Sequence, residues 1–494
     1  MDEQIFISGE LDFNIRNIKK LSLGSFDVIV REFKTVGGVR MCVVFVDALV
    51  NKLTVQNNII RPCVEAKFRF GTAGIESIKN ILQDLLSACD VKEEAYLTNA
   101  LSHVMFGETV LLMDGQVKGL IIETRGWQNR GIQQPGNQKS VRGPQEAFTE
   151  TLLFNAGLLR RKIRSEKLKM EVMRVGNCSK TDICLAYMDG VVDSGLVNTV
   201  RGRIQKIRDV DYLLDSGQLE QLIEDKPRSF FGTIGLNEKP DIVAAKIMEG
   251  RVAVIVDGSP FVLTMPLLFI EGFHAAEDYY GRPFYANILR FLRIVSYITT
   301  LLLPAVYIAL VNFHQEMIPE KLMFTIIQAR EGIPFSSFLE LLLMLVLYEI
   351  IREAVLRLPN VIGSTMGIVG GLIIGQAAIS AGIVGGPVVV VAAITFITSA
   401  VMNPMVDSVV ILRFILLVLA SILGIFGILL GLFGIIVHLC SLESFGVPYM
   451  MPIVPVNKNG MKDAAFRFSI GHIIDKRTGQ IVYKRDADKN KKRF

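Results

Sequence analysis

Apolar residues gather in the second half of the chain. Residues 1–280 read as ordinary soluble sequence, whereas residues 291–440 contain apolar runs close to the roughly 20 residues that span a bilayer. Five apolar segments are predicted, at residues 291–311, 335–351, 361–384, 387–403 and 411–440. The pattern predicts a soluble N-terminal half followed by an α-helical multi-pass membrane domain over residues 288–445. It excludes a soluble enzyme and a protein with a single membrane anchor.

The soluble half contains a duplication. Two apolar runs that end in Asp are each matched by a second such run: Arg40–Ala48 by Asp182–Gly190, and Gly107–Gly115 by Gly250–Gly258. The offsets are 189 − 47 = 142 and 257 − 114 = 143 positions, so two independent pairs give nearly the same spacing. We infer two tandem α/β units, residues 1–124 and 151–280, whose apolar strands are covered on both faces. Helical spacing recurs between the strands, at residues 73–89 and 216–225.

Asp-Gly pairs end three of these strands, at Asp114, Asp189 and Asp257. Tight turns favour a short carboxylate followed by a residue that tolerates positive φ, so turns are the simpler interpretation. A carboxylate metal site is the alternative.

A segment rich in Gly, Gln and Arg, residues 125–150, separates the two units and holds the only Trp. It reads as a linker or docking segment. Arg142-Gly143-Pro144 leads into a predicted helix that carries Arg160 and Arg161. Guanidinium groups suit a phosphate as well as the carboxylates of a neighbouring subunit, and both possibilities remain open.

Basic residues predict the orientation of the membrane domain. Arg290 and Arg293 lie at the start of the first apolar segment, and Arg352 and Arg357 follow the second, so both positions are expected in the cytoplasm. The N-terminus lacks an export signal, which also places the first half there. The basic tail, residues 456–494, prefers the same side, which requires an even number of crossings. We therefore expect the third or the fifth segment not to cross as one full span.

The third apolar segment carries a repeated glycine pattern. Gly363, Gly367, Gly371 and Gly375 recur every four residues, which leaves one helix face almost without side chains. The same segment offers the polar side chains of Ser364, Gln376 and Ser380, which water or an ion could use. Helix packing and pore lining are both compatible with this pattern, and a pore helix is our hypothesis. The fifth segment has a similar seam at Gly424, Gly427, Gly431 and Gly434.

Ionisable residues in and after the second segment need partners, because each costs about 2.5–3.5 kcal/mol to place at the centre of a bilayer. Glu349 with Arg352 and Glu353 with Arg357 have the spacing of salt bridges along a helix. Glu340 lies deeper and has no cation nearby in sequence, so it is expected to face a water path or the charge of another subunit.

Composition narrows the function further. Of 494 residues, 51% are hydrophobic and 20% charged, and the net charge is +5. From Lys458 to the C-terminus eleven Lys or Arg face four Asp, a net of +7, which leaves −2 for the remainder and argues against nucleic-acid binding. We find no nucleotide-binding, metalloprotease or serine-hydrolase motif, and the six cysteines show no paired spacing. Neither an enzyme, a cofactor nor a metal centre is expected.

A series of short sequence blocks between residues 107 and 455 resembles the A subunits of spore germinant receptors in endospore-forming bacteria. The blocks are Val141-Arg142-Gly143-Pro144, Phe148-Thr149-Glu150, Glu249-Gly250-Arg251-Val252-Ala253, Asp257-Gly258, Glu277-Asp278-Tyr279-Tyr280, Pro304-Ala305-Val306-Tyr307, His314-Gln315-Glu316-Met317-Ile318-Pro319, Arg330-Glu331-Gly332-Ile333-Pro334-Phe335, Arg352-Glu353-Ala354, Leu358-Pro359 and Ile374-Gly375-Gln376-Ala377-Ala378. The chain departs from the family pattern at Gln133, Gln134 and Gln138 and at Ser380-Ala381-Gly382, where glutamates are expected.

The resemblance implies a multi-pass protein of the spore inner membrane with its N-terminal domain on the spore core side. It implies a homo-oligomeric, ion-conducting subunit that releases monovalent cations early in germination. A transporter-like B subunit, which senses nutrient, and a lipoprotein C subunit are the implied partners. Two alternatives remain: an auxiliary channel without its own partners, and a secondary transporter with Glu340 at a midplane site. A signalling scaffold is a third class.

Overall fold

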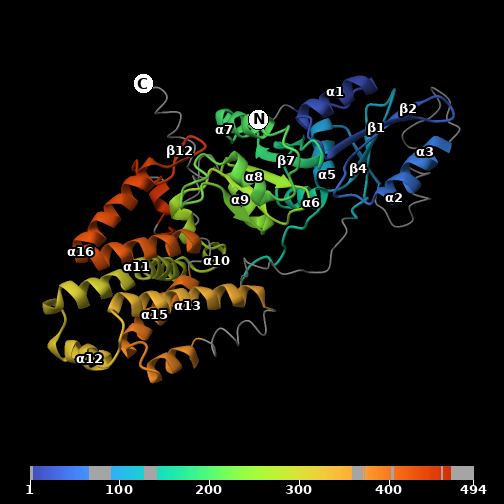
Figure 1. Ribbon diagram of the computed structural model, residues 1–494. Coiled ribbons are helices and arrows are strands. Elements are labelled where there is room, and N and C mark those ends of the chain that lie inside the picture. The colour runs from blue at the N-terminus through green and yellow to red at the C-terminus, as the bar shows by residue number, and fades with distance from the viewer. Residues whose placement is uncertain are drawn as a thin grey trace.

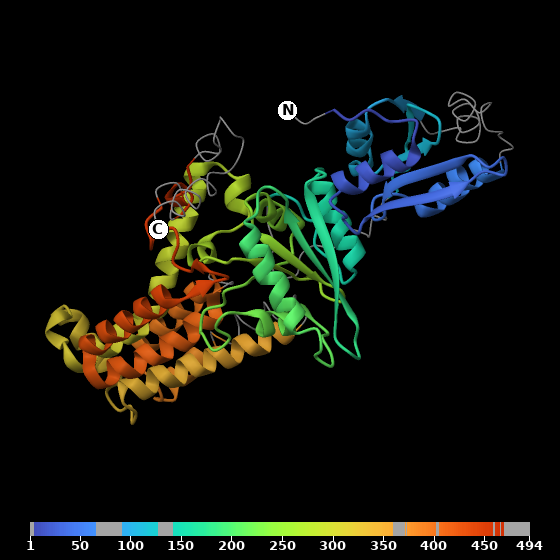
Figure 2. The ribbon, with the colours of Figure 1, turned by 90° about the horizontal axis from the view of Figure 1, so that it is seen from above.

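The computed structural model of the chain describes residues 4–65, 91–126, 142–358, 371, 373–401, 405–457, 460–464 and 466–468. Two units of strands and helices are followed by a bundle of helices. The three parts lie in series, with the first unit at the end away from the bundle (Figure 1, Figure 2). The helix predicted at residues 73–89, much of the 125–150 segment and the first part of the third apolar segment lie outside the described residues.

The first unit is built on a five-stranded sheet with the order β1-β2-β4-β5-β3. All neighbouring strands are antiparallel, with Val43 of β2 opposite Leu111 of β4. Its elements are α1 (Leu11–Leu21), β1 (Val28–Lys34), β2 (Arg40–Val46), α2 (Lys52–Thr54), η1 (Val55–Ile60), α3 (Arg61–Glu65), β3 (Val91–Glu94), α5 (Leu97–Met105), β4 (Thr109–Met113) and β5 (Gly119–Ile122).

The second unit repeats this sheet. Its strand order is β6-β7-β9-β10-β8, again antiparallel throughout, and Leu185 of β7 lies opposite Val254 of β9. Its elements are α6 (Leu152–Lys162), β6 (Leu168–Val175), β7 (Thr181–Met188), α7 (Ser194–Lys206), α8 (Ser216–Ile223), β8 (Gly235–Asn237), α9 (Pro240–Met248), β9 (Val252–Val256) and β10 (Val262–Met265). The α/β prediction therefore needs refinement, because continuous apolar strands occur here in antiparallel sheets that helices cover on both faces.

The repeat extends to single hydrogen bonds. Asp114, at the end of β4, accepts from the backbone N–H of Leu11 at 3.1 Å, and Asp257, at the end of β9, accepts from that of Leu152 at 2.9 Å. Each of these carboxylates thus satisfies an N–H at the start of the unit's first helix, which has no partner within the helix itself. Among the described residues, no group of three or more His, Cys, Asp or Glu side chains could hold a metal ion.

Helices cover both faces of each sheet. In the first unit, α1 and α5 enclose one core, around Leu11 and Leu101, while η1 and α3 enclose the other, around Ile59. In the second unit, α6 and α9 cover one face, and α7 and α8 the other. Burial on both sides explains why the strands are apolar at nearly every position.

A buried ion pair joins the two units. Arg160 of α6 donates from Nε and an Nη atom to the two carboxylate oxygens of Asp27 at 2.8 and 3.0 Å, and both side chains are almost fully buried. The N–H of Phe26 donates to the carbonyl of Met170 in β6 at 3.2 Å. The first unit is therefore fixed to the edge of the second.

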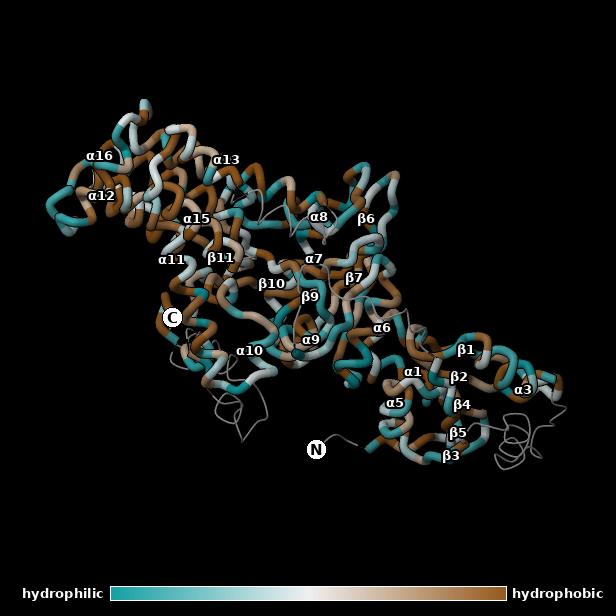
Figure 3. The backbone as a smooth tube through the Cα atoms, turned by 90° about the horizontal axis from the view of Figure 1, so that it is seen from below, coloured by the Kyte–Doolittle hydropathy of each residue, from teal (hydrophilic) through white to brown (hydrophobic). Residues whose placement is uncertain are grey.

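The helical bundle contains most of the remaining elements, and its backbone is dominated by hydrophobic residues (Figure 3). The elements are η2 (Phe269–Phe273), α10 (Glu277–Tyr280), α11 (Pro283–Phe313), η3 (Gln315–Met317), α12 (Glu320–Arg330), α13 (Ser337–Arg357), a helix over residues 373–380, α15 (Gly386–Ala400), α16 (Val406–Ser441), β11 (Glu443–Ser444), β12 (Val447–Pro448) and η5 (Gly460–Lys462). Among the described helices, α11 and α16 are long and apolar enough to cross a membrane.

The helix α16 folds back on itself at Gly424, where the backbone leaves the helical conformation at φ 59° and ψ −139°. A Cβ atom added to Gly431 would collide with the side chain of Leu416, although a straight helix would hold these two residues about 22 Å apart at 1.5 Å per residue. The two arms, residues 406–423 and 425–441, are therefore antiparallel. The fifth apolar segment is therefore two helices joined by a turn.

The bundle has a near end against the second unit and a far end away from it. The chain runs to the far end in α11, returns in α13, makes one hairpin from the 373–380 helix to α15, and makes another from the two arms of α16. At the far end, Phe313 of α11 meets the turn at Gly424. The chain then returns to the start of α11, where Arg290 donates to Asp463 at 2.8 Å. Both ends of the bundle segment thus lie beside the second unit.

A loop of the second unit contacts both arms of α16 at the near end. Ser408 of the first arm donates to the carbonyl of Phe230 at 2.5 Å, while Ser229 and His438 of the second arm lie 3.0 Å apart. Lys226 donates to the carbonyl of Ser441 at 2.8 Å. Phe231 is buried in a core that both the second unit and the bundle supply.

Candidate functional site

Two glycines of the repeat in the third apolar segment, Gly371 and Gly375, pack against neighbouring helices. A Cβ atom added to Gly375 would lie 3.2 Å from Val389 of α15, and one added to Gly371 would lie 3.7 Å from the ring of Tyr348 in α13. Gly375 is buried. Both positions thus lie against neighbouring helices of the same chain. Gly363, Ser364 and Gly367 lie outside the described residues.

Two polar side chains of the 373–380 helix face outward. Gln376 and Ser380 are both exposed, and four residues separate them, so they share one face of the helix next to the face of Gly375. The helix ends at residue 380, and Gly382 just beyond it has a φ of 64°, the left-handed conformation common after a helix. Sequence analysis grouped the glycines and the polar residues of this segment as one candidate set. In the structure, Gly375 is on a buried face, whereas Gln376 and Ser380 are on an exposed face.

Glu340, in the first turn of α13, is completely buried and connects three elements. Its carboxylate accepts from Arg330 of α12 at 3.1 Å and from the N–H of Gly385, just before α15, at 2.9 Å. Sequence analysis expected Glu340 to face water or another subunit. The structure gives it a cation in the same chain, which the local search along one helix missed because Arg330 belongs to α12.

Glu349 receives two cations. It pairs with Arg352 at 2.9 Å, as the spacing predicts, and also with Arg413 of α16 at 2.6 Å. Arg413 is only 1% exposed. The pair ties α13 to the first arm of α16. The presence of an arginine inside a mostly apolar segment was the available signal for this contact, because such a charge needs a partner. Glu353 pairs with Arg357 on an exposed surface, where the contact contributes little.

The arginines around residues 142–161 are divided between surface and interior. Arg142 is exposed. Gly143 has a φ of 116° and lies so close to Tyr280 that a Cβ atom would come within 2.5 Å of the ring. Arg160 is committed to Asp27, and Arg161 donates to Glu146 at 3.1 Å. The end of the 125–150 segment thus packs against α10, and the two helix arginines have partners within the chain.

An ionic cluster that the sequence did not reveal connects α10 to the base of α11. Asp278 accepts from Arg290 at 3.0 Å and from Arg293 at 2.8 Å. Burial by itself would raise the pKa of Asp278, but hydrogen bonds from Arg293 and Arg290 lower it below its ordinary value. The carboxylate therefore stays ionised and holds α10 against the start of α11.

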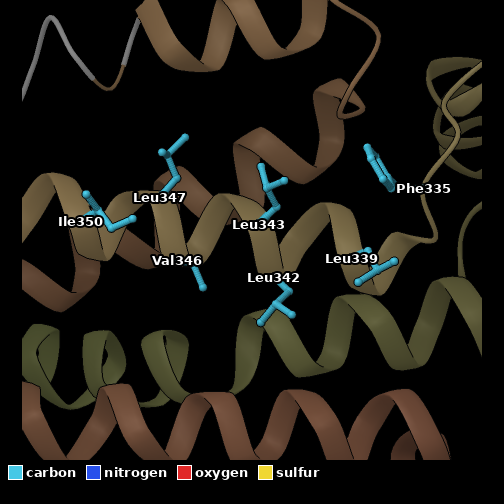
Figure 4. A pocket seen from close by; sticks show the side chains of 7 residues that line it. All are labelled: Phe335, Leu339, Leu342, Leu343, Val346, Leu347 and Ile350. Atoms are coloured by element: carbon cyan, nitrogen blue, oxygen red, sulfur yellow. The ribbon is translucent and has the colours of Figure 1, made fainter.

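An apolar groove of about 540 Å³ runs along α13. Seven hydrophobic side chains line it: Phe335, Leu339, Leu342, Leu343, Val346, Leu347 and Ile350 (Figure 4). Acid–base chemistry requires ionisable groups, and none of these side chains has one. The groove is therefore a surface for apolar contact.

Comparisons with known proteins connect this architecture to a family. The family model described as Bacillus/Clostridium GerA spore germination protein matches residues 16–478. Spore germination protein KA of Bacillus subtilis (strain 168) is 41% identical over 471 residues, which cover 94% of this chain and 86% of the relative. Uncharacterized membrane protein YfkQ of the same organism is 39% identical, with 93% and 89% covered. Spore germination protein GerLA of Bacillus cereus is 35% identical, with 93% and 94% covered.

Among solved structures, the N-terminal domain of the A subunit of the Bacillus megaterium spore germinant receptor GerK3 aligns with a TM-score of 0.42 and 28% sequence identity. The alignment covers 54% of this chain and 98% of that chain. The family match over nearly the whole length implies a role in spore germination at a membrane. This chain belongs to the Bacillus/Clostridium GerA family of spore germination proteins.

Proposed function

We propose that the chain is the ion-conducting subunit of a spore germinant receptor. In this proposal several copies form a ring in the spore inner membrane, and the ring releases monovalent cations when partner subunits sense a nutrient. A transporter-like B subunit and a lipoprotein C subunit are the proposed partners. The proposed division of the chain is two N-terminal units (1–124 and 151–280), a connecting segment (125–150), a membrane domain (288–445) and a basic tail (456–494).

The outward direction of Gln376 and Ser380 carries this proposal. An amide and a hydroxyl that face lipid would lack hydrogen-bond partners, which is unfavourable in hydrocarbon. In a ring of copies, the same helix face can line a water-filled path, as polar side chains do in channels. Gly371 and Gly375 support the path from behind, because they let this helix pack closely on α13 and α15.

The geometry also supports a membrane topology. The helices α11, α13 and α15, the third apolar segment (residues 361–384) and the two arms of α16 give six proposed crossings. An even number places the N-terminal units and the basic tail on one side. Arg290, Arg293, Arg352 and Arg357 lie towards the near end, so the positive-inside tendency assigns that side to the spore core.

Ion flux from liposomes tests the proposal. Gln376→Leu and Ser380→Leu should reduce the release of K⁺ from vesicles that contain the purified chain, because bulky apolar groups would replace polar groups on the pore wall. Val390→Leu is the matched control, because Val390 is 57% exposed on α15 and remains apolar after the change. The control should conduct like the wild type. Equal flux from all four proteins, in oligomers of equal size, would exclude this face as the pore wall.

The transporter alternative receives less support from the site. Glu340 lies in the first turn of α13, paired with Arg330 at the far end of the bundle, rather than at the middle of the bundle where transporters bind substrate. An auxiliary channel that acts alone would conduct in liposomes without B and C subunits. A receptor subunit would need those partners before a nutrient alters its flux, so adding the partners separates the two roles.

A further inference from the structure

The short helix α12 (Glu320–Arg330) connects the far ends of α11 and α13, and Figures 1 and 2 show it at the extremity of the bundle. It has 11 residues, or about 16 Å at 1.5 Å per residue, which is too short to cross the hydrocarbon core. Its C-terminal end is fixed by the Arg330–Glu340 pair and by a contact between Ala329 and Gly385. Both of its ends therefore lie near the far surface of the bundle.

The surface of α12 is amphipathic. Lys321, Thr325 and Gln328 are spaced i, i+4 and i+7 and share one exposed face. The remaining arc is mostly apolar, yet only Ile326 on it is buried. Leu322, Phe324 and Ile327 are 52%, 72% and 54% exposed.

These exposed side chains continue an apolar surface. Phe335, which follows α12, and Leu339 of α13 are 41% and 47% exposed and begin the groove along α13. In a bundle that sits in a bilayer, that groove faces acyl chains or another apolar helix. The apolar side of α12 lies at the end of this surface, where the hydrocarbon meets the headgroups.

We propose that α12 is an interfacial helix, whose apolar side inserts into the leaflet at the far end of the bundle while Lys321, Thr325 and Gln328 face the water. Its partner is the phospholipid bilayer itself. Helices of this kind bury their apolar faces about 5–10 Å into the headgroup and acyl-chain boundary. Through Arg330, such a helix connects the surface of the membrane to Glu340 and to the turn before α15. The inference rests on the proposed placement of the bundle in a membrane.

Tryptophan quenching tests the proposal, because the chain has a single Trp. In a full-length Trp127→Phe background reconstituted in phosphatidylcholine vesicles, Phe324→Trp and Thr325→Trp place a reporter on the apolar and polar faces of α12, because adjacent residues of a helix point about 100° apart. Phe433→Trp, at a 67% exposed position in the second arm of α16, reports on the bundle. The quenchers are acrylamide in water and phospholipids brominated either close to the headgroup or near the chain end.

The expected result is that lipids brominated close to the headgroup quench Phe324→Trp and that acrylamide quenches Thr325→Trp. Equal quenching of both by acrylamide would overturn the proposal, since α12 would then lie in water. Protection of Phe324→Trp from every quencher would also overturn it, because protein would then cover that face. If brominated lipid quenches Phe433→Trp but not Phe324→Trp, only the interfacial helix fails. If no brominated lipid quenches Phe433→Trp, the membrane placement itself fails.

Discussion

Leu416 and Gly431 touch across the two arms of α16, and no side chain larger than hydrogen fits at position 431 without moving Leu416. Gly427 lies equally close to the carbonyl of Leu419. By contrast, a Cβ atom at Gly434 would meet nothing within 4 Å among the neighbouring atoms. The four glycines of this segment therefore differ in role: one turns the chain, two allow the arms to pack, and one is open.

Gly431→Leu should force the arms apart. Overpacking of this kind costs about 1–3 kcal/mol, so the midpoint of thermal unfolding in detergent should fall. Gly434→Leu is the matched control and should leave the midpoint unchanged or raise it, because Gly is about 1 kcal/mol less favourable than Ala in a helix interior. Equal effects of the two variants would contradict the contact between the arms.

Glu349→Gln should destabilise the bundle strongly. It leaves Arg413 buried without a negative partner, and breaking a buried ion pair typically costs about 3–5 kcal/mol. Glu349→Gln combined with Arg413→Met removes both charges and should recover much of the loss. The measurement is the midpoint of thermal unfolding of the wild type, the single variant and the double variant. A double variant no more stable than the single one would show that the charge is not the cause.

Asp27→Ala should loosen the junction between the two N-terminal units, because Arg160 would remain buried and uncompensated. The expected cost is again about 3–5 kcal/mol. Asp182→Ala breaks an exposed pair with Arg174 and should cost about 0–1 kcal/mol. Thermal unfolding and limited proteolysis of the full chain measure both. If the two changes cost the same, the buried pair does not hold the junction.

Glu220 should make the second unit less stable as the pH rises. Burial, and after it repulsion from Glu224, raises the pKa of Glu220 to about 7 from an ordinary value of 4.5. The folded state therefore holds the proton more tightly than the unfolded state. Protonated Glu220 therefore contributes its full stabilisation at pH values below the pKa of the unfolded state. This contribution declines as the pH rises and is lost above the pKa of the folded state.

Glu220→Gln removes this titration. The variant and the wild type should unfold at similar temperatures at pH about 5, where the carboxyl is mostly protonated in the folded state. At pH about 8 the variant should be the more stable, because the wild type then carries a buried charge. A gap that is the same size at both pH values would mean that Glu220 titrates normally.

Much of the fold could be predicted from the sequence because its signals are local. The strands that precede Asp47 and Asp114 recur before Asp189 and Asp257 at nearly the same sequence offset. The structure accordingly contains two sheets whose strands follow the same order. The antiparallel pairing could not be predicted, since an apolar run reports that both faces are covered and not how neighbouring strands run.

The contacts within the candidate site depended on tertiary structure. Gly424, Gly427 and Gly431 recur at similar spacing in one apolar run, so the sequence does not show which of them turns the chain. Glu340 and Glu349 obtain cations from α12 and α16, beyond the reach of pairing rules for a single helix. The apolar segments predicted a membrane domain but not which face of the 373–380 helix is exposed.

The loop at residues 226–231 connects the second unit to both arms of α16. Ser408 and His438 belong to different arms and both contact this loop, so the loop joins the two arms at the near end. At the opposite end the arms join at Gly424, which packs against Phe313. The second unit is therefore connected to the far surface of the bundle through a single two-helix element.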